Sequence, residues 1–458
     1  MSADVPATPG PGATPGEPAW EALLRSVLGP GADEAIAQLR ESGFDPATMA
    51  PGLPQDPAVL AQMFAQVQRM VNDSGDEPVN WPMAHELARQ QASVGGDPTP
   101  VDAERRAVTE AFSVAELWLD AATDLPPTGA QGKAWSRAEW VEATLPTWRT
   151  LTEPIASSLS TALGDAIGAT MGDEPDAQPF GVDMGALVRR LGSAVFGLQV
   201  GQASGTLARE VFGATDIGLP LLEAPVPVLL PHNVAAFTAG LDAPADEVRL
   251  FLALREAAAT RLFTHVPWLR GHLLGAVEAY ARGISIDTEQ LEEAVRSVDP
   301  TDPQALQEAI SGGVFSPQAT PAQRAALDRL ETSLALVEGW VDAVTAQAAL
   351  PHLPHTVALR EMLRRRRAAG GPAEQTFATL VGLELRPRRL RDAVTLWEAI
   401  AADQGQSGRD AVWAHPDLMP SAGDLDDPGG YRARRDAAAD ESSELDAAIA
   451  EILGDDAG

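Results

Sequence analysis

Apolar residues recur every three to four positions along much of the chain, and this spacing predicts a mostly helical protein. The clearest predicted helices span residues 101–125, 245–263, 321–350, 356–368, 372–382 and 387–403. β-branched and aromatic residues are sparse, so few strands are expected. One or two short strands fit the apolar segment 217–231, which proline residues interrupt too often for a helix.

Changes in composition divide the chain into four parts. Residues 1–18 are rich in Pro, Gly and Ala and are expected to be disordered. Residues 19–96 are predicted to form a helical N-terminal region, and residues 97–403 the main domain. From residue 404 the chain becomes polar, acidic and broken by Gly and Pro, so a mostly disordered tail is predicted for 404–458.

Three glycines repeat every four residues in the uncharged run 191–208. Gly197, Gly201 and Gly205 would leave one helix face without side chains, so that a neighbouring backbone can approach closely. The same pattern occurs in pairs of membrane helices. Polar residues inside the run and arginines at both ends favour tight packing in a water-soluble core instead.

The charge balance narrows the classes of partner. The chain of 458 residues has 33 basic and 65 acidic residues, a formal net charge of −32. Such a chain repels nucleic acid and anionic lipid, so neither is an expected partner. Cysteine is absent, which excludes thiolate metal sites and cysteine nucleophiles. The N-terminal segment has no basic region followed by an apolar run, so a cytoplasmic location is expected.

A lone carboxylate stands out in the predicted helix 245–263. This helix is apolar almost all round, which is typical of a buried helix. Arg255 and Glu256 are therefore expected inside the core or at the wall of a cavity. An ionised glutamate in that setting needs a partner or a raised pKa. It could be half of a catalytic pair or one arm of a buried ion pair.

Two more carboxylates occur in the predicted helix 321–350. Glu338 and Asp342 are four residues apart and therefore share a helix face. Gly339 lies beside them and allows another element to approach closely. Glu256 would meet these two carboxylates if the two helices pack together.

Several segments resemble one known family. GLQVGQASGTLAREVFGATDIGLPL, LREAAATRLFTHVPWLRGHLLGAVEAYARGI and LALVEGWVDAV occur in the order found in bacterial zincin-like metallopeptidases. This family is a domain of unknown function, described in part as hydrolases, with a sister branch linked to coenzyme F420 biosynthesis. The resemblance covers about residues 80–403. It implies a zincin-like fold and a helix that resembles His-Glu-x-x-His, in which two imidazoles hold zinc and the glutamate is the general base.

The sequence departs from that motif at the metal ligands. Laid on it, Arg255 and Ala259 replace the two histidines, and Glu256 takes the position of the base. Glu338 would be the third ligand, with Asp342 beside it. Arginine and alanine offer zinc no lone pair. No metal is therefore expected, although the resemblance implies zinc in relatives.

Other histidines and arginines offer weaker candidate sites. His265 and His272 would stand far apart on a helix that Pro267 interrupts. His352 and His355 flank a proline turn and could either form a metal-binding pair or be solvated turn residues. An arginine cluster, which includes Arg364, Arg388 and Arg391, could bind an anion. Internal pairing with the excess carboxylates, or a solvated face, is the preferred alternative for that cluster.

Three hypotheses follow. The first is a non-catalytic zincin-like protein that binds a peptide or protein partner. In it, a charged group of Arg255, Glu256, Glu338 and Asp342 takes the place of the metal. The second is an active hydrolase in which Glu256 works with Mg²⁺ or Mn²⁺ held by carboxylates. The third is a helical scaffold in which Glu256 is only structural.

Overall fold

The computed structural model describes residues 77–171, 184–282, 320–368, 389–438 and 440. The predicted disordered segment 1–18, the helices expected before residue 77 and the helix expected at 372–382 lie outside the described residues.

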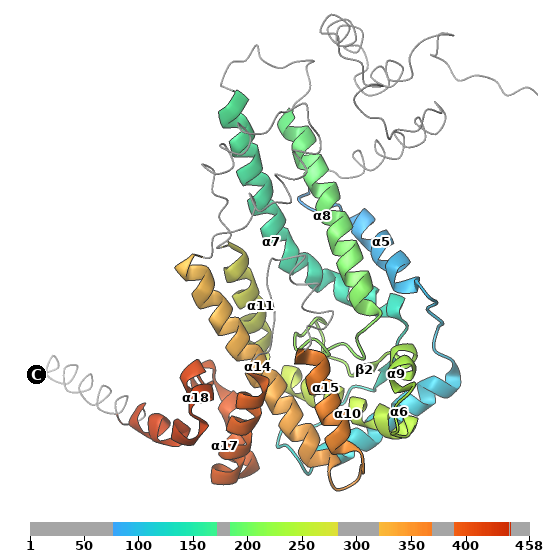
Figure 1. The fold of residues 1–458 in the computed structure, drawn as a ribbon, viewed down its shortest axis with the longest axis vertical. Helices are drawn as coiled ribbons and strands as arrows, with labels where there is room; N and C mark the ends of the chain where they lie inside the picture. The colour runs from blue at the N-terminus through green and yellow to red at the C-terminus, as the bar shows by residue number, and fades with distance from the viewer. Residues whose placement is uncertain (1–76, 172–183, 283–319, 369–388, 439, 441–458) are drawn as a thin grey trace, which may run out of the picture. The chain divides into compact units, whose positions relative to one another are not determined.

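The described chain is mostly α-helical and contains one pair of short strands (Figure 1). The elements are α5 (Trp81–Ser93), α6 (Asp102–Leu119), β1 (Lys133–Ala134), α7 (Arg137–Met171), α8 (Met184–Ala208), β2 (Val228–Leu229), α9 (Pro231–Thr238), α10 (Ala245–His265), α11 (Pro267–Arg282), α14 (Pro321–Ala349), α15 (Thr356–Ala368), α17 (Leu390–Ala411), α18 (Ala422–Asp426) and three short 3₁₀ turns at Val412–Ala414, Pro416–Leu418 and Pro428–Gly430. This confirms the predicted fold class.

The chain forms two compact units. One comprises 1–83, 156–198 and 286–315, and the other comprises 84–155, 199–285 and 316–458. The candidate residues on α10, α14 and α15 all belong to the second unit.

Two helices form the centre of the second unit. α10 packs against α6, α9, β2 and α14, while α14 also packs against α11 and α17. α10 is buried on nearly all sides, as its apolar circumference predicted. α14 is likewise buried along most of its length from Leu330 to Ala349. These two helices bring residues about eighty positions apart to one place.

The short strands pin a loop next to α10. β1 and β2 pair in parallel, with Lys133 opposite Val228 and Ala134 opposite Leu229. The strand predicted within 217–231 is β2. The backbone N–H of Leu230, just after it, donates to the carbonyl of Phe212 at 2.9 Å. This hydrogen bond fixes the start of the loop that connects Phe212 to β2.

The glycine face of α8 packs against the backbone of α5. A Cβ added at Gly201 would lie 2.7 Å from the carbonyl oxygen of Ala84, and one at Gly205 would lie 2.5 Å from that of Ala88. The repeat therefore serves close helix packing, as the sequence favoured. None of the described helices combines the length and the apolar composition that crossing a bilayer requires.

The chain after residue 403 differs from the irregular tail that was predicted. Gly405 has a φ of +75° and interrupts α17, which then continues to Ala411. Arg409 and Asp410 are 1% and 6% exposed, and Asp410 accepts hydrogen bonds from the indole of Trp340 and the hydroxyl of Thr123. Charges that look solvated in the sequence are buried here because they are paired, so the folded part extends past residue 411.

Candidate functional site

Glu256 points from α10 into the loop that precedes β2. Its Oε1 accepts a hydrogen bond from the backbone N–H of Ala214 at 2.8 Å and a longer one from that of Val228 at 3.4 Å. Its Oε2 accepts from both the N–H and the hydroxyl of Thr215, at 3.1 Å and 2.6 Å. The side chain is 4% exposed. Both carboxylate oxygens therefore accept hydrogen bonds, mainly from Ala214 and Thr215 in the loop and more weakly from Val228 at the start of β2.

The loop passes so close to the acidic side chains that two of its residues must be glycine. A Cβ at Gly213 would lie 2.4 Å from Oε2 of Glu256. Gly218 has a φ of +79°, a conformation that favours glycine, and a Cβ there would lie 2.7 Å from Oε1 of Glu338. Residues 213–218 thus form a tight cover over both helices.

Glu338 and Asp342 project from one face of α14, as their spacing predicted, and both are buried, at 5% and 3% exposed. The Arg255 guanidinium lies between them, with Nη2 3.3 Å from Oε2 of Glu338 and Nη1 3.7 Å from Oδ1 of Asp342. Arg255 therefore links α10 to α14 through two carboxylates.

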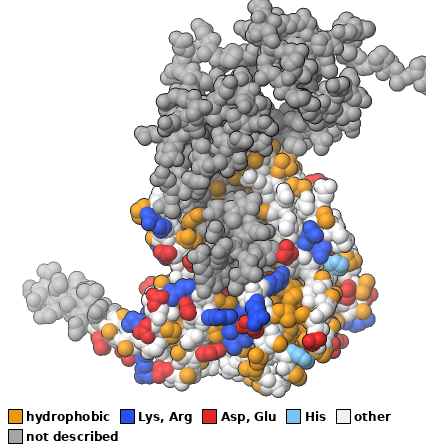
Figure 2. Space-filling view, in the orientation of Figure 1, with side chains coloured by type: hydrophobic (Ala, Val, Ile, Leu, Met, Phe, Trp, Pro, Cys, Tyr) orange, Lys and Arg blue, Asp and Glu red, His pale blue; other side chains and the backbone are white. Residues whose placement is uncertain are grey.

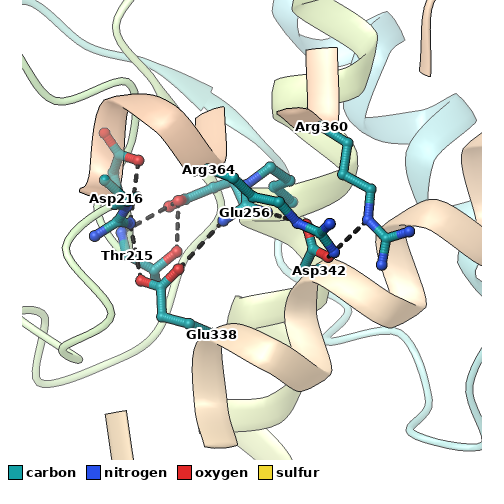
Figure 3. A network of polar contacts seen from close by, with 9 residues as sticks. Thr215, Asp216, Glu256, Glu338, Asp342, Arg360 and Arg364 are labelled. Atoms are coloured by element: carbon teal, nitrogen blue, oxygen red, sulfur yellow. Dashed lines mark hydrogen bonds and ion pairs between the residues drawn. The ribbon is translucent and has the colours of Figure 1, made fainter. Parts of the chain in front are cut away.

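Three arginines of α15 complete this arrangement (Figure 3). Arg360 Nε and Arg364 Nη2 lie 2.7 Å and 2.6 Å from Oδ2 of Asp342. Arg367 Nη2 lies 2.8 Å from Oε1 of Glu338 and 3.5 Å from Oδ1 of Asp216 in the loop. We use the term ion cluster for the four arginines and two carboxylates Arg255, Glu338, Asp342, Arg360, Arg364 and Arg367.

Glu256 stands apart from the ion cluster. Within the described residues it forms no ion pair, and its partners are the loop amides and the Thr215 hydroxyl. The expected four-residue group of Arg255, Glu256, Glu338 and Asp342 is therefore not one set of ion pairs. The reason is geometric, because neighbouring helix residues point about 100° apart, so Arg255 and Glu256 address different elements.

Burial changes the proton affinity of Glu256. Loss of water around the carboxylate raises its pKa to about 7, and the hydrogen bonds from Thr215 and Ala214 partly oppose this rise. The cavity that Glu256 shares with Arg255, Ala259 and Glu338 has a volume of about 30 Å³. That volume is enough for about two water molecules.

Other predicted site residues lie elsewhere. Arg391 is exposed and lies 3.7 Å from Glu361, and Arg388 is outside the described residues. His352 stacks on Trp118, whereas His355 bonds to Glu247 on α10. Among the described residues there is no group of three or more His, Cys, Asp or Glu side chains placed to hold a metal ion.

Sequence reasoning missed the loop contacts of Glu256 altogether. Ala214 acts through its backbone, which leaves no trace in the residue type, and Thr215 is an ordinary loop residue. The α15 arginines did carry a signal, because residues 360, 364 and 367 share one helix face. These three arginines pair with carboxylates of the same chain, which is the arrangement that the internal-pairing alternative describes for the arginine cluster.

A comparison with solved structures found a similar fold. A structure described as a putative hydrolase with a novel fold, from Chloroflexus aurantiacus, matches with a TM-score of 0.56 and 20% identity. The match covers 78% of this chain and 99% of that one. At this sequence identity the similarity indicates a shared fold only. A comparison with curated proteins gave no match.

The sequence profile for zincin-like metallopeptidases matches residues 79–431. This range includes α10, α14 and α15 and therefore every residue of the ion cluster. It also extends past residue 403, in agreement with the ordered C-terminal helices. The chain belongs to the zincin-like metallopeptidase family.

Proposed function

We propose that this protein is a non-catalytic member of its family, which acts as a binding or scaffold protein for a peptide or protein partner. One observation carries the proposal: the Arg255 guanidinium lies between the buried carboxylates of Glu338 and Asp342. In this proposal, the fixed positive charge of Arg255 takes the role of the zinc ion that the family resemblance implies.

The residues present do not fit zinc. Arg255 and Ala259, at the positions that the resemblance assigns to imidazole ligands, have no lone pair to donate. The carboxylate of Glu338 already faces the guanidinium groups of Arg255 and Arg367. A metal would have to displace these arginines and would then rest on carboxylate oxygen alone, which is a poor match to the nitrogen and sulfur ligands that zinc prefers.

The contacts of Glu256 support a structural task for this residue. A general base must lie within hydrogen-bond reach of the proton that it removes, and hydrogen bonds from the protein compete for its lone pairs. Here Oε1 receives the N–H of Ala214, and Oε2 receives two hydrogen bonds from Thr215. The carboxylate therefore holds the loop 213–218 against α10. This task explains why a glutamate is useful at this position in a protein without catalysis.

The size of the cavity supports the same conclusion. Its volume of about 30 Å³ is far below the ~300–1,000 Å³ of pockets that hold small-molecule ligands. The proposed partner would therefore bind to the outer surface of this helical frame.

One observation favours a second candidate, an active hydrolase that uses a carboxylate-held cation. Acidic groups with a strongly raised pKa inside a pocket are frequent in catalytic sites, and Glu256 is such a group. The ion cluster weighs against it, because the carboxylates that would hold Mg²⁺ or Mn²⁺ already pair with arginines at 2.6–2.8 Å.

Metal content and turnover, measured on the same preparations, separate the two candidates. The purified protein, incubated with Zn²⁺, Mg²⁺ or Mn²⁺ and then desalted, would be analysed by mass spectrometry of the elements. Peptide and ester hydrolysis would be compared for the wild type, Glu256→Gln and the surface control Glu361→Gln. We expect no stoichiometric metal and no turnover that depends on Glu256. A bound equivalent of metal, or activity lost in Glu256→Gln and kept in Glu361→Gln, would overturn the proposal.

A further inference from the structure

A second hollow on the same unit lies between α6, α9 and the start of α10. Its volume is about 280 Å³. Small apolar side chains make up most of its wall, among them Ala107, Val108, Leu229, Val234 and Ala235. A cavity of ~150 Å³ can hold a benzene molecule, so this groove has room for an apolar body of roughly six to eight carbon atoms.

Among the described residues, one cation lines this apolar groove. Arg249, on the second turn of α10, is half-buried, and its Nε is buried without a hydrogen-bond partner. Among the arginines that the structure describes as buried or half-buried, it alone has no carboxylate, carbonyl or hydroxyl partner for its guanidinium. In a protein with a net charge of −32, such an unpaired cation is conspicuous. A ligand that supplies an anion would compensate this charge and give the buried Nε a partner.

The surrounding backbone also favours a negatively charged ligand. The first turns of α6 and α10 contribute Ala103, Glu104 and Ala245 to the wall, and the N-terminal end of a helix carries partial positive charge. Glu104 is the acidic side chain among the described lining residues. Its Oε2 accepts the backbone N–H of Val101 at 2.8 Å, which ties the carboxylate to the N-terminus of its own helix.

We propose that this groove binds a small amphiphilic carboxylate. The carboxylate group pairs with the Arg249 guanidinium, which can bind it through two parallel N–H donors. The apolar body covers Val108, Leu229 and Val234. Figure 2 shows hydrophobic side chains exposed on the side of α9, next to the basic side chains around α15. This site is separate from the ion cluster and does not depend on the proposed function.

Calorimetric titration of the full-length protein with octanoate tests the proposal, with octanamide as an uncharged ligand of the same shape. We expect octanoate to bind at least about tenfold more tightly than octanamide, because it alone pairs with the guanidinium. Arg249→Gln should remove this preference and leave the octanamide affinity unchanged. Arg324→Gln removes the same charge from an exposed position at the start of α14, outside the groove, and should behave as the wild type.

A second variant locates the ligand independently of charge. Ala235 is exposed on α9 and lines the groove, so Ala235→Leu narrows the groove without disturbing the core. It should weaken both ligands about tenfold or more, since the apolar body loses its place. The proposal is overturned if octanoate does not bind, if both ligands bind equally well to the wild type, or if neither Arg249→Gln nor Ala235→Leu changes the octanoate affinity.

Discussion

Removal or reversal of the Arg255 charge should lower the free energy of unfolding. The size of the loss depends on the partners that Glu338 and Asp342 keep in the ion cluster. Arg255→Met keeps most of the aliphatic stem and removes only the guanidinium. Glu338 then retains Arg367 at 2.8 Å, and Asp342 retains Arg360 and Arg364. Neither buried carboxylate is left without a partner, so the loss is smaller than for an isolated buried pair.

The expected sizes follow from this difference. Breaking an isolated buried ion pair costs about 3–5 kcal/mol. Because both carboxylates keep partners, we expect Arg255→Met to lower the free energy of unfolding by about 1–2 kcal/mol. Arg255→Glu places a third carboxylate against Glu338 and Asp342, and we expect a loss of about 4–5 kcal/mol or failure to fold.

Urea unfolding followed by far-UV circular dichroism measures these losses. Arg365→Met is the matched control, because this arginine lies on α15 with its side chain 77% exposed and, among the described residues, pairs with Glu361 alone. Its loss should be within about 0.5 kcal/mol of zero. The reasoning is refuted if Arg255→Glu is as stable as the wild type, or if Arg255→Met costs no more than Arg365→Met.

Three further predictions concern separate parts of the structure. Folding raises the pKa of Glu256 from 4.5 to about 7, so the protonated side chain contributes fully to stability below pH 4.5, and this contribution is lost as the pH rises to 7. The free energy of unfolding of the wild type should therefore fall by roughly 2–3 kcal/mol across that pH range, and Glu256→Gln should remove this fall. An unchanged pH profile in Glu256→Gln would contradict the assignment. Gly205→Ala should cost about 1–3 kcal/mol because its Cβ meets the Ala88 carbonyl, whereas Gly271→Ala on α11, where a Cβ meets nothing within 4 Å, should stabilise by roughly 0.5–1 kcal/mol; thermal unfolding of both variants checks the contrast. Arg255→His combined with Ala259→His places two imidazoles one turn apart at the cavity that Glu338 lines, and this double variant should bind one equivalent of zinc that neither the wild type nor the single variants hold; absence of zinc in the double variant would count against the correspondence with the family motif.

Much of the helical frame could be predicted because periodicity is a local property. The helix expected at 245–263 is α10, Ala245–His265, and the one expected at 321–350 is α14, Pro321–Ala349. The shared face of Glu338 and Asp342 follows from a spacing of four residues. These features depend on neighbours in the sequence, so the sequence contains them.

The partners of the site residues depend on the tertiary fold and were not predictable in the same way. Glu256 is bound by backbone amides of a loop about forty residues earlier, and a backbone donor has no residue signature. Arg409 and Asp410 follow a glycine kink and look like part of a polar tail, yet they are buried against Trp340 and Thr123. Buried charge is recognisable only when its partner is known.

The most direct test of the central claim is a crystal structure of the protein grown with excess zinc, with anomalous diffraction recorded at the zinc absorption edge. The account predicts electron density for the Arg255 guanidinium between Glu338 and Asp342 and no zinc peak at that position. A zinc peak bound by Glu338, with Arg255 turned away from both carboxylates, would contradict it.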